Sequence, residues 1–433
     1  MYKIALYTLG CKVSQYETEA IAERFAERGC EIVDFRSSAD AYIINTCTVT
    51  AESDRKSRQV IRRAIAKNPS AVVAAIGCYT QRAPEDASMI EGVDVVIGTQ
   101  DKLAVVDRVL DALGEREPKQ FVSAPPLDGV PFEEMTVTRS DRTRAYIKIE
   151  DGCEAKCSYC AISGARGPVR SKSPEAVVAE VRGLVAGGTS EVVLTGIETG
   201  SYGRDFDYPF TLADLILLLD KEGIPERIRL GSLAPELIGE EFCEKLCGVT
   251  RLCPHFHLSL QSGSSRILGA MRRRYNRDMA LANIRRLRET FPTAQFTTDL
   301  MVGFPGETED DFFETMSVVS EVGFIDTHVF AYSKRRGTPA ADYPDQVDEA
   351  TKKERSHRLI AESHRVREEV LSRIAGERES LNCILETYRD GVYTAHSDEF
   401  AEVSVAAPAG LEGTSVKVRP VSHKDGVILG ELV

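Results

Sequence analysis

Short apolar segments alternate with amphipathic helical patterns along most of this 433-residue chain. Such alternation predicts strands joined by helices, and strands joined in this way pair in parallel. In residues 1–114 the expected strands lie at 3–9, 41–45, 71–76 and 94–97. This part is therefore expected to be a parallel α/β domain, in which ligands collect at the carboxyl ends of the strands.

Six further strand-like segments occupy residues 139–370, each followed by a helix or by a loop and a helix. They lie at 145–149, 191–195, 227–231, 255–260, 296–302 and 327–332. Six βα repeats predict a partial TIM-type (βα)6 barrel, whose chemistry sits at the carboxyl ends of its strands. The preceding residues 115–138 include Pro118, Pro125, Pro126 and Pro131 and are expected to form a linker.

The C-terminal part returns to short strands. A long helical pattern at 348–374 comes first, and residues 373–433 then alternate short strand patterns with glycine-containing turns. That pattern predicts a small β-barrel of OB-like size. The expected fold class is thus α/β, with an N-terminal parallel domain, a central partial barrel and a C-terminal β-barrel.

Three closely spaced cysteines follow the first expected strand of the central barrel. Cys153, Cys157 and Cys160 have three and then two residues between them, which is too tight for a disulfide framework. Structural zinc sites and cubane iron–sulfur clusters normally take four protein ligands, so three thiolates leave one metal corner open for chemistry. A zinc knuckle or three unrelated thiols remain the simpler alternatives.

A second set of three cysteines is spread over the N-terminal domain. Cys11, Cys47 and Cys78 each come just after an expected strand. Because parallel strands end at one edge of their sheet, these thiols are expected to meet there and hold a second cluster. Gly10 and Gly77 would let the backbone approach a bulky inorganic core. The alternative is three incidental buried thiols.

Composition restricts the location and the partners. The first residues turn polar by Lys12, so no signal peptide is expected; the protein is expected to be cytoplasmic, with no membrane partner, and to use its 11 cysteines for metal binding or catalysis. A formal net charge of −13 argues against a polyanion gripped over the whole surface. Contacts with RNA are therefore expected at local basic loops, although each loop could be only a solvated face: Arg272, Arg273, Arg274, Lys334, Arg335 and Arg336.

Other cysteines and histidines are expected to be structural. Cys243 and Cys247 fall on one predicted helix and, with Cys253, imitate a ligand set, but buried cysteine packs as a small apolar residue. The same interpretation holds for Cys30 and Cys383. His255, His257 and His328 lie in expected strands and are interpreted as core histidines.

In combination, the two three-cysteine sets and the order of the three parts resemble the methylthiotransferase family of radical S-adenosylmethionine (SAM) enzymes. The resemblance extends over nearly the whole chain and includes further motifs: Asn45-Thr46-Cys47-Thr48-Val49-Thr50, Ala165-Arg166-Gly167, Ser259-Leu260-Gln261-Ser262-Gly263, Val302-Gly303-Phe304-Pro305-Gly306-Glu307-Thr308 and Phe330-Ala331-Tyr332-Ser333. Three features depart from the family pattern. Thr195-Gly196-Ile197-Glu198 replaces the usual Gly-Gly-Glu, Asp299 stands where a first glycine would be expected, and Ser14 replaces a common Asn.

The resemblance implies a tRNA-modifying transferase with two 4Fe–4S clusters and SAM. Cys153, Cys157 and Cys160 would hold the SAM-binding cluster, and Cys11, Cys47 and Cys78 the auxiliary one. Contacts with SAM are expected from Tyr159, Glu198, Gln261 and Gly303, and residues 373–433 would be an RNA-binding TRAM domain. A cellular one-electron reductant would be a partner.

The stretch from Thr8 to Glu19 most resembles the branch that converts N6-threonylcarbamoyladenosine at position 37, in the anticodon loop of tRNA, to its 2-methylthio derivative. That reaction would consume two SAM, one as methyl donor and one as the source of a 5′-deoxyadenosyl radical. Within the family, the alternatives are methylthiolation of isopentenyladenosine in tRNA or of an aspartate in a ribosomal protein. From another class, the chain could be an iron–sulfur electron-transfer or RNA-binding protein without SAM chemistry.

Overall fold

The computed structural model describes residues 1–115, 120–140 and 142–433, so Pro118 of the expected linker lies outside the described residues. The chain divides into two compact units. The first unit comprises Met1–Val137, Tyr146–Lys172 and Ser333–Ala341; the second comprises Thr138–Ala145, Ser173–Tyr332 and Asp342–Val433. Each unit therefore joins segments that are far apart in the sequence, and all six cysteines of the two expected sets belong to the first.

The first unit is built, over its described residues, on a six-stranded parallel sheet of order β2-β1-β3-β4-β5-β6. Its strands are β1 (Lys3–Thr8), β2 (Glu31–Val33), β3 (Ala41–Thr46), β4 (Val72–Gly77), β5 (Val95–Ile97) and β6 (Phe121–Ser123). The expected parallel α/β fold is confirmed. Two short strands were not predicted, and one of them, β6, lies in the segment expected to be a linker and pairs with β5.

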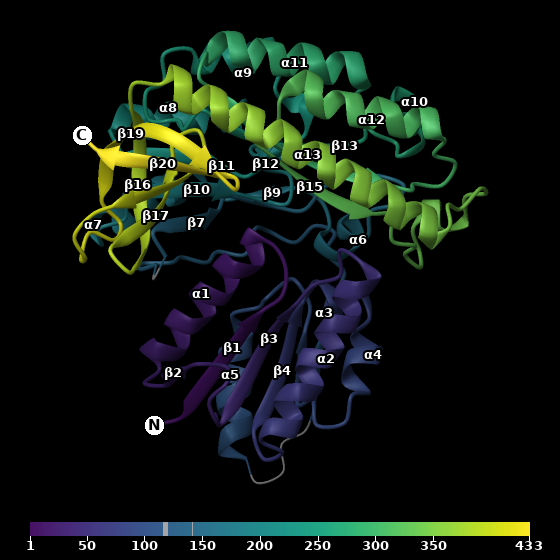
Figure 1. Ribbon diagram of the computed structural model, residues 1–433. Helices are drawn as coiled ribbons and strands as arrows, with labels where there is room; N and C mark the ends of the chain where they lie inside the picture. The colour runs from purple at the N-terminus through teal and green to yellow at the C-terminus, as the bar shows by residue number, and fades with distance from the viewer. Residues whose placement is uncertain (116–119, 141) are drawn as a thin grey trace. The chain divides into compact units, whose positions relative to one another are not determined.

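Helices cover both faces of this sheet (Figure 1). Successive residues of a strand point to opposite faces, so Ile43 packs in the cluster that includes α1 and α5, while Ile44 packs in the cluster that includes α2. Strands buried on both faces read as continuous apolar runs, which is why the sequence predicts them well. The remaining elements of the unit are α1 (Lys12–Glu27), α2 (Ala51–Lys67), α3 (Cys78–Arg82), α4 (Pro84–Ser88), α5 (Ala104–Gly114), β8 (Glu150–Asp151), α6 (Ile162–Arg166) and β9 (Arg170–Ser171).

The second unit contains the barrel strands. β7 (Arg144–Lys148) begins in this unit and flanks β10 (Glu191–Thr195), which pairs with β11 (Arg227–Leu230). β12 (Ser232–Leu233) continues from β11, and the parallel order then runs through β13 (His255–Gln261), β14 (Gln295–Val302) and β15 (Asp326–Ala331). The expected partial (βα)6 barrel is confirmed.

Helices alternate with these strands, and Figure 1 shows α9, α11 and α12 (teal to green) together on one side of them. The helices are α7 (Pro174–Ala186), α8 (Leu212–Glu222), α9 (Glu240–Leu246), α10 (Ser265–Ala270), α11 (Arg277–Thr290), α12 (Glu309–Val322) and α13 (Glu349–Glu377). α13 begins within one residue of its predicted start. The Asp348 carboxylate caps the helix by accepting hydrogen bonds from the backbone N–H groups of Ala350 and Thr351.

A closed barrel of order β16-β17-β18-β20-β19 ends the chain, as the sequence predicts. Its strands are β16 (Leu381–Arg389), β17 (Val392–Ser397), β18 (Glu402–Ala406), β19 (Ser415–Lys424) and β20 (Val427–Leu432). Closure leaves no unpaired sheet edge. None of the described helices combines the length and apolar character that crossing a membrane requires.

Candidate metal centre

Three cysteines lie at the carboxyl ends of neighbouring strands in the first unit. Cys11 follows β1 as the N-cap of α1, Cys47 directly follows β3, and Cys78 follows β4 as the first residue of α3. The three strands are adjacent and parallel, so these ends share one edge of the sheet. Cys47 and Cys78 are buried, whereas Cys11 is exposed. The structure thus brings the second predicted set together.

One glycine leaves room beside these thiols, and a second permits close packing of the backbone just before Cys78. Gly10 has a φ of 121°, and a β-carbon there would lie 3.3 Å from Cβ and 3.4 Å from Sγ of Cys47. Gly77 has a φ of 106°, and a β-carbon there would lie 2.5 Å from Oδ1 of Asn45. Both conformations favour glycine, and a side chain at Gly10 would fill the space next to Cys47. This cradle fits a bulky inorganic group held by the three sulfur atoms.

Burial disfavours the thiolate form at this edge. Burial raises the pKa of Cys78 to about 11, and the neighbouring Cys11 and Cys47 act in the same direction while Arg166 and Lys102 oppose it. Burial also raises the pKa of Cys47. Since metals bind the thiolate, loading of this site must release protons.

A fully buried arginine touches one of these sulfur atoms. Arg166, at the end of α6, donates from Nε to Sγ of Cys78 at 3.1 Å. Its Nη1 lies 2.6 Å from Oε1 of Glu17 and 3.1 Å from Oδ2 of Asp151. Asp151 stands two residues before Cys153, so one guanidinium group contacts a ligand of one cysteine set and the chain that leads into the other.

The network around Arg166 is completed by two buried lysines. Lys102 lies 2.5 Å from Oε1 of Glu17, and Lys148 lies 3.4 Å from the same atom and 3.5 Å from Oδ2 of Asp151. Burial alone would raise the pKa of Glu17, but the charges of Arg166, Lys102 and Lys148 hold it well below its usual value. The buried carboxylates are therefore ionised and paired.

The loop carrying the first cysteine set is closed at its base by the pairing of β8 with β9. Cys153 N–H donates to the Gly167 carbonyl at 3.0 Å, and Ile162 N–H donates to Sγ of Cys160 at 3.3 Å. Gly152 has a φ of 96°, and a β-carbon there would lie 1.8 Å from the Pro168 carbonyl oxygen. Such close backbone approach fixes where the loop begins. Cys157 is buried, and Cys153, Tyr159 and Cys160 are half-buried.

Residues 333–341 also pack in this unit, and they correct one prediction. Arg335, expected to contact RNA, is buried; its Nη1 lies 2.7 Å from Oδ2 of Asp54, and its Nη2 donates to the Thr48 carbonyl at 2.9 Å. The guanidinium group is committed to the segment after Cys47 and cannot reach a phosphate. Lys334 and Arg336 are exposed.

Two of the other predicted SAM contacts, in the second unit, occupy unusual environments. Glu198 follows β10 and accepts from the Ala234 N–H at 3.1 Å; burial raises its pKa to about 7 despite Arg273 nearby. Gln261 ends β13 with a φ of 68° and is 7% exposed. Non-glycine residues rarely adopt this conformation, which tends to mark functional sites.

Packing within the second unit accounts for the glycine at position 303 and for one arginine of the basic loop at 272–274. A β-carbon at Gly303 would lie 2.3 Å from Cγ of Lys352, so this glycine permits close packing against α13. In the basic loop, Arg272 and Arg274 are exposed, whereas Arg273 is half-buried and donates to the Ser259 carbonyl at 3.0 Å.

Most of the residues expected to be structural are buried: Cys30, Cys243, Cys253, Cys383, His255 and His257. Two are not. Cys247 is exposed because α9 ends at Leu246, and the His328 side chain is 62% exposed although it belongs to β15. The interpretation of His328 as a core residue is therefore wrong.

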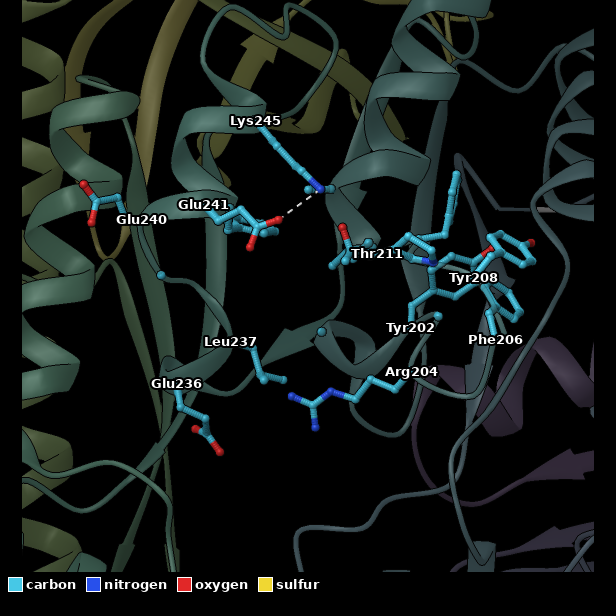
Figure 2. Close-up of a pocket in the computed structure, with 18 of the residues that line it drawn as sticks. Tyr202, Arg204, Phe206, Tyr208, Thr211, Glu236, Leu237, Glu240, Glu241 and Lys245 are labelled. Atoms are coloured by element: carbon cyan, nitrogen blue, oxygen red, sulfur yellow. Dashed lines mark ion pairs between the residues drawn. The ribbon is translucent and has the colours of Figure 1, made fainter.

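A cavity of about 640 Å³ lies in the second unit, among the loops after β10 and β12 (Figure 2). Aromatic residues Tyr202, Phe206 and Tyr208 line one part, and the ion pair of Lys245 with Glu241 at 3.2 Å lies in another. The residues that line it include none of the predicted ligands.

Comparison with known proteins places both cysteine sets in matched regions. The model of the Radical SAM superfamily matches residues 147–319, and that of "Uncharacterized protein family UPF0004" matches residues 3–98. Threonylcarbamoyladenosine tRNA methylthiotransferase MtaB of Bacillus subtilis is 44% identical over 97% of this chain and 94% of its own length. The protein of that name from Thermotoga maritima is 36% identical over 99% of this chain and 96% of its own length.

A relative named for a different nucleoside and, separately, one solved structure complete the comparison. The tRNA-2-methylthio-N(6)-dimethylallyladenosine synthase of Thermoanaerobacter sp. (strain X514) is 32% identical over 98% of this chain and 92% of its own length. The radical SAM methyltransferase TsrM of Kitasatospora setae superposes with a TM-score of 0.57 at 15% identity, over 79% of this chain and 74% of TsrM. That likeness concerns the fold.

Proposed function

This chain belongs to the tRNA methylthiotransferase family of radical SAM enzymes, and we propose that its substrate is N6-threonylcarbamoyladenosine at position 37 of tRNA. Methylthiolation of tRNA by a transferase that uses 4Fe–4S clusters and SAM follows from the family. The proposal adds the position of the base, its substituent, the use of two SAM per turnover and a cytoplasmic place of action. The relatives from Bacillus subtilis and Thermotoga maritima, at 44% and 36% identity, carry the threonylcarbamoyladenosine name, which supports this substrate.

One observation carries the proposed reaction, whereas the relatives' names support the substrate: Cys11, Cys47 and Cys78 meet at one sheet edge, in the same compact unit as Cys153, Cys157 and Cys160. Each set offers three sulfur ligands and leaves one corner of a cubane open. One open corner suits SAM binding and the other suits the sulfur to be inserted. A simple electron carrier has no need of two such corners.

The reaction explains why the chain must hold both groups. The C2–H bond of adenine is not acidic, so acid–base catalysis offers no route; when bound, the clusters and SAM supply the one-electron and sulfur chemistry that this bond requires. The chain's own residues bind and place these groups. Gly10 leaves space at Cys47, and Arg166 holds Cys78 by a hydrogen bond. Burial of Cys47, Cys78 and Cys157 limits access of water.

Iron content tests the two ligand sets. Anaerobically reconstituted protein is expected to hold about eight irons, and replacing all three cysteines of either set by alanine is expected to leave about four. The exposed Cys247, changed to serine, provides a matched control and is expected to retain all eight. Full iron loading after loss of Cys11, Cys47 and Cys78 would refute the auxiliary site.

Nucleoside mass spectrometry of tRNA tests the substrate. Cells lacking the protein are expected to lose 2-methylthio-N6-threonylcarbamoyladenosine and to retain its precursor, because the upstream modification does not need this enzyme. The wild-type gene should restore the product, and either triple-alanine variant should not. An unchanged profile, or loss of a methylthiolated dimethylallyl nucleoside instead, would contradict the proposed substrate.

RNA contacts at the exposed basic residues can be measured by salt dependence. Changing Lys334 and Arg336 together to glutamine is expected to weaken tRNA binding and to reduce the slope of log affinity against log salt by about one per lost phosphate contact. Arg24 and Arg28, which are exposed in and just after α1, provide the control when changed in the same way. Equal affinities and slopes for both double variants would rule out the loop as an RNA contact.

A further inference from the structure

Three polar residues meet on adjacent strands of the barrel sheet, outside every site described above. His257 belongs to β13, Asp299 to β14 and His328 to β15. Nε2 of His257 lies 3.3 Å from Oδ2 of Asp299, and Nδ1 of His328 lies 3.1 Å from its Oδ1. Asp299 and His328 are direct partners in the strand register. The carboxylate is thus held between two imidazoles.

These side chains face the interior of the barrel. On the same strands, Phe256 packs against Phe291 at the end of α11 in a tilted arrangement, with ring centres 5.4 Å apart, and Arg288 of α11 lies over Phe296. Those residues therefore mark the helix side of the sheet. Because side chains alternate along a strand, His257 and Asp299 point to the opposite side, which is the barrel interior.

The array continues into the sheet through a hydroxyl group. Oγ1 of Thr297 lies 2.8 Å from Nδ1 of His257 and 3.0 Å from Nε2 of His255. Burial would raise the pKa of Asp299, but hydrogen bonds from His257 and His328 hold it well below its usual range. The interior of the barrel at this level therefore presents an ionised carboxylate and imidazole groups instead of an apolar surface.

One end of the array is open. His257 is 8% exposed and is fixed by Thr297 and Asp299. The His328 side chain is 62% exposed, with its Nδ1 on Asp299 and its Nε2 3.7 Å from Oδ2 of Asp326. Asp299 lies three residues before the end of β14, roughly 10 Å below the rim where chemistry occurs in such barrels. A group that extends inward from a base held at the rim would meet His328 and Asp299 first.

We propose that His257, Asp299 and His328 form a subsite for the polar substituent on N6 of the modified adenosine. This inference rests on the proposed function and concerns how the substrate is selected. A threonylcarbamoyl group offers N–H and O–H donors for Asp299 and carbonyl and carboxylate acceptors for His328. A dimethylallyl group offers neither, so it would displace water from His328 and Asp299 without replacing the hydrogen bonds to that water.

The energetic difference between the two substituents is large. A polar group that loses its hydrogen-bond partners on binding destabilises the complex, and a charged group does so more strongly. Sites built to hydrogen-bond a substrate therefore reject the analogue that lacks the polar group much more strongly than apolar pockets reject a small change in shape. The array thus selects against dimethylallyladenosine as well as for the threonylcarbamoyl form.

The test compares two tRNA substrates, one with threonylcarbamoyladenosine and one with dimethylallyladenosine at position 37, on reconstituted holoenzyme. Changing His328 to phenylalanine is expected to lower kcat/KM for the first substrate at least tenfold, with most of the loss in KM. His328→Gln, which keeps a donor and an acceptor, is expected to recover part of it. His364→Phe changes an exposed histidine of α13 in the same way and is expected to match the wild type.

Further readouts separate a binding role from a structural one. Iron content, melting temperature and SAM cleavage without tRNA are expected to be unchanged in both His328 variants, because the side chain is exposed. Wild-type selectivity for the threonylcarbamoyl substrate with no change in the variants would overturn the subsite alone. A wild-type enzyme that never methylthiolates this substrate would overturn the proposed function itself.

A divalent cation is the alternative ligand for these three residues, and it can be tested in the same protein. A ligand atom of each of the three residues lies within 4.8 Å of the others, which is close enough for a divalent cation. Metal analysis of protein lacking all six cluster cysteines should find no cation that Asp299→Asn removes. A bound metal ion lost in that variant would overturn the subsite in favour of a metal site.

Discussion

Replacing Arg166 by methionine is expected to lower the free energy of unfolding by about 3–5 kcal/mol. The side chain is fully buried, and its guanidinium group lies within 3.1 Å of both Glu17 and Asp151. Lys102 and Lys148 stay near these carboxylates, but the cation placed between them is lost. Removing one partner of a buried ion pair leaves a charge that neither water nor protein stabilises.

Urea denaturation of the reconstituted protein measures this effect, and iron content measures its local consequence. Because Arg166 donates to Cys78, the variant is also expected to bind iron less tightly at the auxiliary set than at Cys153, Cys157 and Cys160. Arg229 provides the control: it is 3% exposed and lies 2.6 Å from Glu191 in the second unit. Arg229→Met should also destabilise the protein but should leave iron binding intact, and equal iron loss in both variants would contradict a specific role for Arg166.

Changing Gly152 to alanine is expected to abolish the cluster at Cys153, Cys157 and Cys160. A β-carbon at this position would lie 1.8 Å from the Pro168 carbonyl oxygen, and the φ of 96° disfavours any side chain. The backbone must therefore move directly beside Cys153. We expect iron content to fall from about eight to about four and stability to fall by at least about 2 kcal/mol.

A second glycine of the same loop provides a matched control. Gly164 lies within α6, where a β-carbon would meet no atom within 4 Å. Gly164→Ala is therefore expected to retain full iron loading and to be neutral or slightly more stable, since alanine favours a helix. The pair is measured by iron analysis and by the charge-transfer absorption of the clusters. Full loading of the Gly152→Ala protein would show that the loop tolerates the displacement.

Most strands of the parallel sheet in the first unit and of the partial barrel in the second could be predicted, because buried parallel strands appear in the sequence as continuous apolar runs. The short strand β6 could not, since its three residues lie in a segment that contains several prolines and gains its order from pairing with β5. The proximity of Cys11, Cys47 and Cys78 could be predicted for a similar reason: strand ends in a parallel sheet share one edge, so sequence position predicts which side chains lie close together.

Residues whose role depends on tertiary contacts could not be assigned from the sequence. Arg335 looks like part of a basic surface loop, and only its contacts with Asp54 and Thr48 show that it is structural. Arg166 stood in a recognised motif, but its place between Cys78 and Glu17 depends on three separate chain segments. His328 has the pattern of a strand residue, and its exposure follows from the position of β15 at the end of the sheet.

The first unit is assembled from chain segments that are far apart in the sequence, and this has a consequence for biosynthesis. This unit includes Ser333–Ala341, where Ala340 N–H donates to the Ser158 carbonyl at 2.8 Å within the loop of Cys157 and Cys160. During translation, the ribosome must therefore complete nearly four fifths of the polypeptide before that loop can acquire all its native contacts. Nascent chains arrested earlier are expected to accept iron poorly, and we therefore expect delivery of iron and sulfide to be a late event in the maturation of this enzyme.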